Sequence, residues 1–134
     1  MKVGLAGQGA FGVKHLDAIK NIPGIEVITL TGGNQEKTKE VAAKYGIPHY
    51  TGDLAESLKQ PGLEAMILAT PTQMHAAQGV QCMKAGKHVQ IEIPVCDTLA
   101  DADLLLKTQQ ETGVICMGGH TRRFNPSQIG RAHV

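Results

Sequence analysis

Short apolar runs alternate with amphipathic stretches along most of this 134-residue chain, and this alternation constrains the fold more than any other feature. The runs are rich in aliphatic and β-branched residues, which is typical of strands buried on both faces. They span residues 2–7, 25–30, 47–50, 65–70, 87–92 and 114–119. Strands separated by helices form parallel sheets with helices on both faces. The sequence therefore predicts an α/β fold, a doubly wound Rossmann domain with a six-stranded parallel sheet.

Between the runs, apolar residues recur at the spacing of one helix face. The predicted buried faces are Gly12, Leu16 and Ile19; Thr38, Val41, Ala42 and Tyr45; Ala76, Val80 and Met83; and Leu99, Ala102 and Leu106. Gly46, Gly86 and Gly113 are expected to end the last three of these helices. Thr98, with Asp101 three residues later, is expected to cap the last helix.

The composition argues against several classes of function. The net charge is +1 and there is no basic run, which argues against nucleic acids or acidic membranes as partners. Aromatic residues make up only 3% of the chain, too few for a base-stacking surface. No apolar run approaches the roughly 20 residues that cross a bilayer. The start of the chain does not resemble a signal peptide.

Three cysteines, Cys82, Cys96 and Cys116, are widely spaced and form no C-x-x-C pair. An odd number at this spacing predicts neither a zinc site nor a disulfide framework. We expect reduced thiols that belong to the core of a cytoplasmic protein, and no metal site.

A glycine-rich turn, "GLAGQGAFGVKH" at residues 4–15, lies between the first strand and the first helix and fits G-x-G-x-x-G. In this context Gly7 allows a tight turn, Gly9 lets a pyrophosphate approach the backbone, and Gly12 lets the helix pack closely. Gln8, Ala10 and Phe11 lie within the same turn and are candidates for cofactor contact. The start of the helix would offer N–H groups to phosphates. The alternative is a glycine turn with a purely structural role.

In folds of this kind, the residue type at the end of the second strand determines whether NAD or NADP is preferred. An NAD site usually has an acidic residue there, whereas this chain reads "LTGGNQEK", with Gly32, Gly33 and Asn34. The missing carboxylate favours NADP, with Lys37 or the backbone binding the 2′-phosphate. The alternative is NAD, with Glu36 turned inward.

The alternating pattern stops after Gly119. Residues 1–119 are therefore predicted to form the dinucleotide-binding domain. Residues 120–134, "HTRRFNPSQIGRAHV", have no clear period. We expect them to form a tail of loop, or the start of a substrate domain that this chain lacks.

Three stretches resemble one family, the Gfo/Idh/MocA oxidoreductases: "GQGAFGVKH", "ATPTQMHAAQGVQCMKAGKHVQIEIP" (69–94) and "RRFNP". The second contains the T-P-x-x-x-H turn and the A-G-K-H-V stretch that are similar to that family. The resemblance implies an NAD(P)-dependent dehydrogenase with a small-molecule substrate. One departure is Glu92-Ile93-Pro94, where the family has E-K-P, because isoleucine cannot transfer a proton.

In detail the chain resembles the branch of this family that oxidises a carboxylated muconate semialdehyde, a product of lignin-derived aromatic degradation. That branch would transfer a hydride from a cyclic hemiacetal to NADP and form a pyrone dicarboxylate. Two alternatives remain: a sugar or inositol dehydrogenase of the same family, and a non-catalytic dinucleotide-binding module or redox sensor. Without a substrate domain, the chain alone is expected to turn over little substrate. The resemblance allows a homo-oligomer in a full-length protein.

Candidate site residues follow the fourth and fifth strands, at the edge where such sheets bind ligands. Thr70, Pro71 and Thr72 are expected to contact the cofactor. His75 is expected to bond to cofactor or substrate near the nicotinamide and is the catalytic candidate; alternatively it caps or packs. The resemblance places Glu92, followed by Ile93, at the nicotinamide ribose.

The remaining histidines and arginines are assigned structural or binding roles according to their positions in the predicted fold. His15 is interpreted as a packing residue of the first helix, and His88 as structural. Arg122 and Arg123 follow the sixth strand on the ligand side, where a guanidinium could bind a carboxylated substrate or a cofactor phosphate. The alternative for both arginines is a solvated loop.

Overall fold

The computed structural model describes residues 1–129 and contains a single six-stranded sheet in which every pair of neighbours is parallel. The strands are β1 (Lys2–Ala6), β2 (Glu26–Thr31), β3 (His49–Thr51), β4 (Ala65–Leu68), β5 (His88–Glu92) and β6 (Cys116–Gly119). Their order across the sheet is β3-β2-β1-β4-β5-β6. The predicted doubly wound fold is confirmed, with its switch point between β1 and β4.

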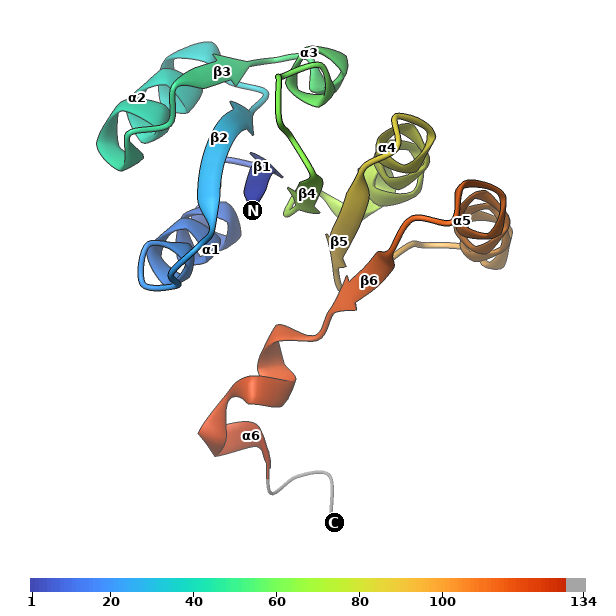
Figure 1. Ribbon diagram of the computed structural model, residues 1–134. Coiled ribbons are helices and arrows are strands. Elements are labelled where there is room, and N and C mark those ends of the chain that lie inside the picture. The colour runs from blue at the N-terminus through green and yellow to red at the C-terminus, as the bar shows by residue number, and fades with distance from the viewer. Residues whose placement is uncertain (130–134) are drawn as a thin grey trace.

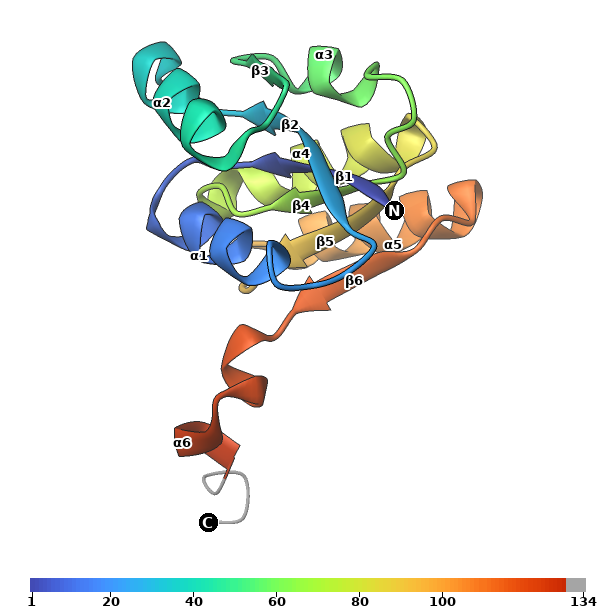
Figure 2. The same cartoon turned by 60° about the vertical axis from the view of Figure 1, so that its left-hand side comes forward.

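The helices cover the two faces of the sheet unequally (Figures 1 and 2). They are α1 (Ala10–Ile19), α2 (Gln35–Tyr45), α3 (Leu54–Leu58), α4 (Thr72–Lys84) and α5 (Leu99–Thr112), followed by a 3-10 helix η1 (Thr121–Phe124) and α6 (Pro126–Ile129). Helices α1 and α2 lie on one face, and α3, α4 and α5 lie on the other. None of the helices in residues 1–129 is both long and apolar enough to cross a membrane.

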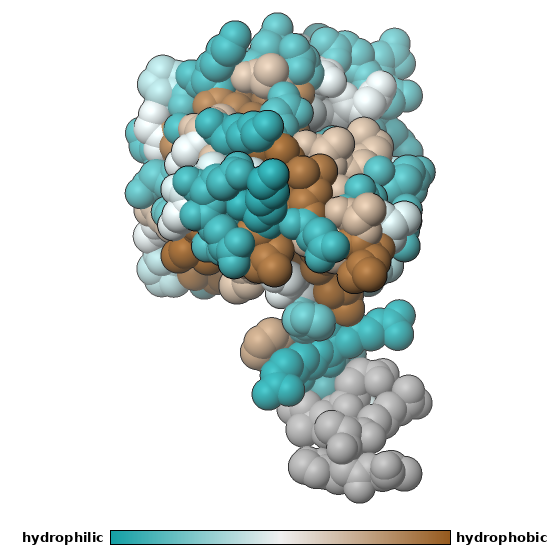
Figure 3. Space-filling view, turned by 90° about the vertical axis from the view of Figure 1, so that its right-hand side faces the viewer, coloured by the Kyte–Doolittle hydropathy of each residue, from teal (hydrophilic) through white to brown (hydrophobic). Residues whose placement is uncertain are grey.

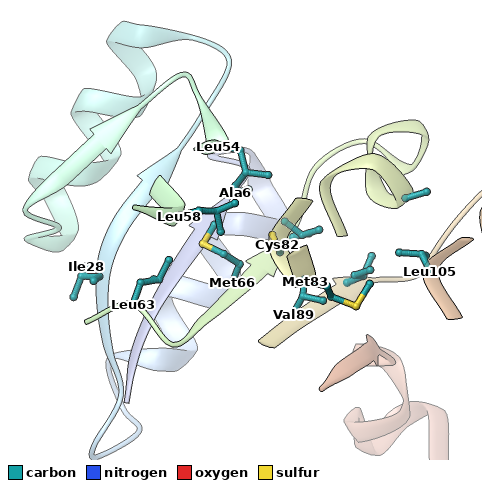
Figure 4. Close-up of a cluster of buried hydrophobic side chains, with 13 residues drawn as sticks. Ala6, Ile28, Leu54, Leu58, Leu63, Met66, Cys82, Met83, Val89 and Leu105 are labelled. Atoms are coloured by element: carbon teal, nitrogen blue, oxygen red, sulfur yellow. The ribbon is translucent and has the colours of Figure 1, made fainter. Parts of the chain in front are cut away.

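Two aliphatic clusters form the core, one on each side of the sheet. The smaller cluster joins α1 and α2 to the sheet through residues such as Leu5 and Leu30, which are fully buried. The larger cluster lies on the side of α3, α4 and α5 (Figure 4), and its labelled members are Ala6, Ile28, Leu54, Leu58, Leu63, Met66, Cys82, Met83, Val89 and Leu105. The chain thus builds its interior almost without aromatic side chains.

Thr98, Gly46 and Gly113 mark helix ends as predicted, whereas the cap at Asn34 was not predicted, because Asn34 was considered only for the cofactor site. Asn34 caps α2 by accepting a hydrogen bond from the Lys37 backbone N–H at 3.0 Å. Thr98 caps α5 by accepting one from the Asp101 N–H at 3.1 Å. Gly46 ends α2 with a φ of 67°, which glycine adopts without strain. Gly113 ends α5 in the same way, with a φ of 72°.

The predicted buried face of α5 is wrong. Leu99 and Leu106 are 79% and 57% exposed, whereas Leu105 and Thr108 are buried. The cause lies on α4, where the missing side chain of Gly79 makes room for Leu105: a Cβ at Gly79 would lie 2.8 Å from Leu105 Cδ2. Contact with α4 therefore decides how the helix is turned. Figure 3 shows the side of the molecule that carries α5, where brown apolar residues lie among teal ones.

Helix α3 was not predicted. It is only five residues long, too short to show a helical period in the sequence. Asp53 caps it through the Ala55 N–H at 3.0 Å. Its Ser57 is buried and bonds the hydroxyls of Thr29 at 2.8 Å and Thr31 at 2.7 Å, which ties α3 to β2.

The segment after β6 was expected to form a tail of loop or the start of a substrate domain, and its described part contains the two helical turns of η1 and α6. Both views show this segment extending away from the sheet (Figures 1 and 2). The end of the predicted tail, residues 130–134, lies outside the described residues.

Candidate functional site

The glycine turn lies at the carboxyl end of β1, beside the switch point of the sheet. Gly7 has a φ of 110°, and a Cβ there would lie 2.7 Å from the carbonyl carbon of Ala69, after β4. A Cβ at Gly12 would collide with the carbonyl oxygen of Gly7. Both positions therefore need glycine for the close packing of α1 against β1 and β4.

Gly9 differs from the other two glycines of the turn. Its backbone is extended, with a φ of −74°, and a Cβ there would meet no atom within 4 Å. It is the N-cap of α1, and no side chain caps that helix. The N–H groups of the first helical turn, which includes Ala10 and Phe11, have no acceptor within the helix and suit an anion. The space beside Gly9 is therefore open.

Three neighbouring hollows extend from this turn along the carboxyl edge of the sheet. The first, here called the glycine cleft, is lined by Gly7, Gln8, Gly9, Thr31, Gly32, Gly33, Gly52, Leu54, Ala69, Thr70, Pro71, Met74 and Gln78. The second, the proline hollow, is lined by Phe11, Ala69, Thr70, Pro71, Thr72, His75, Glu92 and Ile93. The third, the arginine hollow, is lined by Phe11, Glu92, Ile93, Pro94, Thr121 and Arg122. Shared lining residues join each hollow to the next.

The glycine cleft ends at the residues after β2. A Cβ at Gly32 would collide with Thr38 Oγ1 and lie 2.8 Å from Gln8 Cδ, so that side of Gly32 is already filled. Gly33 lines the same cleft, and a Cβ there would meet nothing within 4 Å. Space for a further side chain therefore exists at Gly33 and not at Gly32.

The other polar candidates at this end are near the start of α2. The Asn34 side-chain oxygen is committed to the cap of that helix. Glu36 and Lys37 are both exposed on the first turn and line none of the three hollows. Glu36 is thus not turned inward in this structure.

His75 is 1% exposed and binds two loops of the sheet edge together. Its Nδ1 lies 2.9 Å from the carbonyl oxygen of Pro94, after β5, and its Nε2 lies 2.7 Å from that of Thr70, after β4. Carbonyl oxygens only accept hydrogen bonds, so each ring nitrogen faces an acceptor of the backbone. The ring borders the proline hollow without a free nitrogen to offer a ligand.

Glu92 ends β5 and is 7% exposed. Its Oε1 lies 2.8 Å from His15 Nε2 and 2.9 Å from Thr121 Oγ1. Sequence reasoning missed both partners and treated His15 as a packing residue. A weak signal was present, because His15 follows Gly12 by three residues and so shares the side of α1 that faces the sheet.

The two arginines after β6 have different surroundings. Arg122 borders the arginine hollow beside Glu92, whereas Arg123 is exposed and does not line it. Both belong to η1, and both are free of carboxylate partners within the described residues. Only Arg122 is therefore placed to meet a ligand at this edge.

In the described part of the chain no metal centre is found, and two of the three thiols are deactivated by burial. Residues 1–129 contain no cluster of three metal-ligating side chains. Burial raises the pKa of the Cys82 thiol to about 12 and also raises that of Cys116. Because the thiolate is the nucleophile, both groups are inert near neutral pH. All three cysteines lie in or against the larger core cluster, as predicted.

This fold and edge define a dinucleotide-binding oxidoreductase domain, and comparison with known proteins agrees. The family model described as "Oxidoreductase family, NAD-binding Rossmann fold" (GFO_IDH_MocA) matches residues 1–120. The chain belongs to this family, as the motifs of the sequence indicated.

Among curated relatives, the chain is 57% identical over 127 residues to the 4-carboxy-2-hydroxymuconate-6-semialdehyde dehydrogenase of Sphingobium sp.. It is 30% identical over 125 residues to the scyllo-inositol 2-dehydrogenase (NAD(+)) of Bacillus subtilis. These matches cover 95% and 93% of this chain. The chain spans only 40% and 36% of the length of those two relatives.

Solved structures show the same fold. A probable dehydrogenase from Thermotoga maritima superposes with a TM-score of 0.90 at 25% identity, over 98% of this chain and 41% of that one. A biliverdin reductase from Synechocystis, solved with biliverdin and NADP+, superposes with a TM-score of 0.88 at 20% identity, over 98% of this chain and 42% of that one.

Proposed function

We propose that this domain binds NADP in preference to NAD. The observation that carries the proposal is the end of β2, where no carboxylate faces the glycine cleft. Gly32 and Gly33 stand where an NAD site has its acidic residue, and Glu36 is exposed outside the cleft. No carboxylate lines the cleft to repel a 2′-phosphate, and on the first turn of α2, outside the cleft, the charge of Glu36 is balanced by that of Lys37.

In this arrangement the dinucleotide extends along the three hollows. The adenosine half lies in the glycine cleft, the pyrophosphate lies at Gly9, and the nicotinamide half reaches the proline hollow. Glu92 offers a buried carboxylate to the nicotinamide ribose, and Thr72 and Ile93 border the same hollow. His75 acts as a positioning residue here, because both its nitrogens are occupied by carbonyl oxygens.

A titration of the chain with each dinucleotide tests the proposal. We expect NADPH to raise the melting temperature, because a ligand at 100 times its Kd adds about 2.7 kcal/mol to the free energy of unfolding. NADH at the same concentration should raise it less. A preference for NADH of about tenfold or more would contradict the choice of NADP.

Gly33→Asp should shift the preference toward NAD. Gly33 lines the cleft and a Cβ there meets no atom within 4 Å, so a carboxylate at this position could accept the ribose hydroxyls and repel a 2′-phosphate. At an effective dielectric near 20 such repulsion reaches a few kcal/mol, about tenfold or more in the NADPH Kd. Competitive titration of both nucleotides measures it. Gly33→Asn is the matched control and should leave the NADPH Kd nearly unchanged; an equal loss in both variants would show a steric effect.

For the reaction, we propose oxidation of a carboxylated cyclic hemiacetal, the product being a pyrone dicarboxylate. The 57% identity to a muconate-semialdehyde dehydrogenase supports this substrate class. Bound NADP+ would accept the hydride from the hemiacetal carbon, and the hydroxyl proton would pass to solvent. The chain's own residues orient the reactants: Glu92 at the ribose, and Arg122 at a substrate carboxylate. Such an oxidation needs no covalent intermediate, in agreement with the inert thiols.

Binding of 2-pyrone-4,6-dicarboxylate to the NADP-saturated chain tests the role of Arg122. Arg122→Ala should weaken that binding by about fivefold, since an exposed ion pair contributes up to about 1 kcal/mol. Arg123→Ala, which removes the same charge outside the hollow, is the matched control. Equal effects of the two variants would mean a diffuse charge effect. No binding of the dicarboxylate to the wild-type chain would favour a dinucleotide-binding module.

Turnover by this chain alone is expected to be low. Phe11 and Ile93 are 52% and 41% exposed beside the nicotinamide end, so water reaches the edge where the hydride would move. Water weakens each electrostatic contact with the reactants. This expectation concerns the 134-residue chain and leaves the binding proposal unaffected.

A further inference from the structure

The carboxylate of Glu92 is held from two directions by residues far away in the sequence. His15 comes from α1, 77 residues earlier, and its Nε2 lies 2.8 Å from Oε1. Thr121 comes from η1, 29 residues later, and its hydroxyl oxygen lies 2.9 Å from Oε1, 3.1 Å from Oε2 and 3.3 Å from the Gly119 carbonyl oxygen, so its one hydrogen is shared among these acceptors, with Oε1 the nearest. A buried carboxylate with charge-assisted hydrogen bonds of this kind has a single orientation.

The two oxygens of Glu92 are used unequally. Oε1 accepts from both His15 and Thr121, whereas Oε2 accepts only the longer bond from Thr121. Each carboxylate oxygen can accept two hydrogen bonds, so Oε2 keeps acceptor capacity. Glu92 borders both the proline hollow and the arginine hollow. A hydroxyl in either hollow is the natural donor to this oxygen.

His15 does not itself reach those hollows. It lines an apolar groove between α1 and the strands β4, β5 and β6, beside Ile19 and Met117. Its side chain is 16% exposed, and its contact with the ligand edge is the bond to Glu92. Any effect of His15 on a ligand must therefore pass through that carboxylate.

We propose that His15 is a positioning residue for the nicotinamide half of the dinucleotide. His15 and Thr121 together hold Glu92 so that Oε2 accepts a hydrogen bond from a hydroxyl of the nicotinamide ribose. This inference rests on the proposed dinucleotide site. It adds that the first helix, through His15, acts on the far end of the cofactor as well as on the pyrophosphate.

A half-ligand separates positioning from general support of the fold. The compound 2′,5′-ADP carries the adenine, the ribose and the 2′-phosphate but has no nicotinamide ribose. We expect His15→Leu to weaken NADPH binding by about tenfold, the effect of losing one hydrogen bond to a charged group. Binding of 2′,5′-ADP should stay within about twofold of the wild-type value. Fluorescence titration measures the first and calorimetry the second.

Conservative variants give the matched controls. The amide nitrogen of a glutamine lies near the position of Nε2, so His15→Gln should restore most of the NADPH affinity. Thr121→Val keeps the shape and removes the hydroxyl, and should weaken NADPH without affecting 2′,5′-ADP. Thr121→Ser keeps the hydroxyl and should bind as the wild type does. The Thr121 pair lies in η1, away from the core, and tests the orientation of Glu92 separately, whereas His15→Gln, which keeps a nitrogen donor, tests His15 itself where His15→Leu fails to fold.

Each other result has a defined meaning. Unchanged NADPH affinity in a folded His15→Leu chain overturns the inference, whatever Thr121→Val shows, and leaves the proposed function standing. Equal weakening of NADPH and 2′,5′-ADP also overturns it, because that pattern means damage to the fold. A wild-type chain that binds neither compound overturns the proposed function together with the inference.

Discussion

The Gly9→Val chain is expected to fold and to bind NADPH at least about 100-fold more weakly than the wild-type chain. Gly9 has a φ of −74° and a ψ of −169°, a conformation open to any residue, and a Cβ there meets no atom within 4 Å. The valine side chain would occupy the space proposed for the pyrophosphate. The substitution therefore removes the ligand's place without disturbing the packing of α1.

Two measurements separate binding from folding in this variant. Thermal unfolding without ligand should change little, whereas the rise in melting temperature produced by NADPH should disappear. Titration with 2′,5′-ADP gives a further control, because that compound has no bridging pyrophosphate and should retain part of its affinity. If Gly9→Val binds NADPH like the wild type, the glycine turn has only a structural role.

Gly12→Ala should produce the opposite pattern, a loss of stability. A Cβ at this position would collide with the Gly7 carbonyl oxygen, which is backbone and cannot rotate away. Helix α1 would have to move off the end of β1. We expect the free energy of unfolding to fall by about 3 kcal/mol or more, the upper range for inserting one methyl group into packed structure.

Urea unfolding of the ligand-free chains measures this effect. Gly9→Ala makes the same chemical change three residues earlier in the same turn, and should cost about 1 kcal/mol or less. Similar losses in the two variants would contradict the view that only Gly12 is held by close packing. The contrast between Gly9 and Gly12 thus divides the motif into one ligand-facing glycine and one packing glycine.

Local features of the sequence were sufficient for the sheet and most helix boundaries. The apolar runs predicted all six strands, most clearly the central ones, because a strand that is covered on both faces is apolar along most of its length. Gly46, Gly113 and Thr98 act within a few residues of their own position, so their roles could be inferred without the fold. The stripe Gly12, Leu16 and Ile19 is buried as expected.

The sequence-based predictions failed where contacts between distant elements determine which residues are buried or helical. Helix α5 has a run of three leucines, 104–106, which allows more than one buried face. Leu105 is the leucine that is buried, because Gly79 has no side chain and leaves room for it. Helix α3 is stabilised by Leu54 and Leu58 in the core and by the hydrogen bond of Ser57 to β2. No local sequence pattern predicts these contacts.

The candidate site divides in the same way. The glycine turn and the absence of an acidic residue after β2 can be read directly, because both depend on residue type at one position. That Gly33 is open while Gly32 is filled depends on Gln8 and Thr38, which only the folded chain brings there.

The sequence by itself determined the class of fold, the position of the glycine turn and the family to which the chain belongs. Only the tertiary structure places the two ring nitrogens of His75 against the carbonyl oxygens of two loops, and the ring of His15 against the carboxylate of Glu92. The physical reason is the range of each interaction. Backbone preferences and apolar periodicity act between neighbours along the chain, whereas a hydrogen bond across 77 residues exists only after the sheet has brought its two ends together.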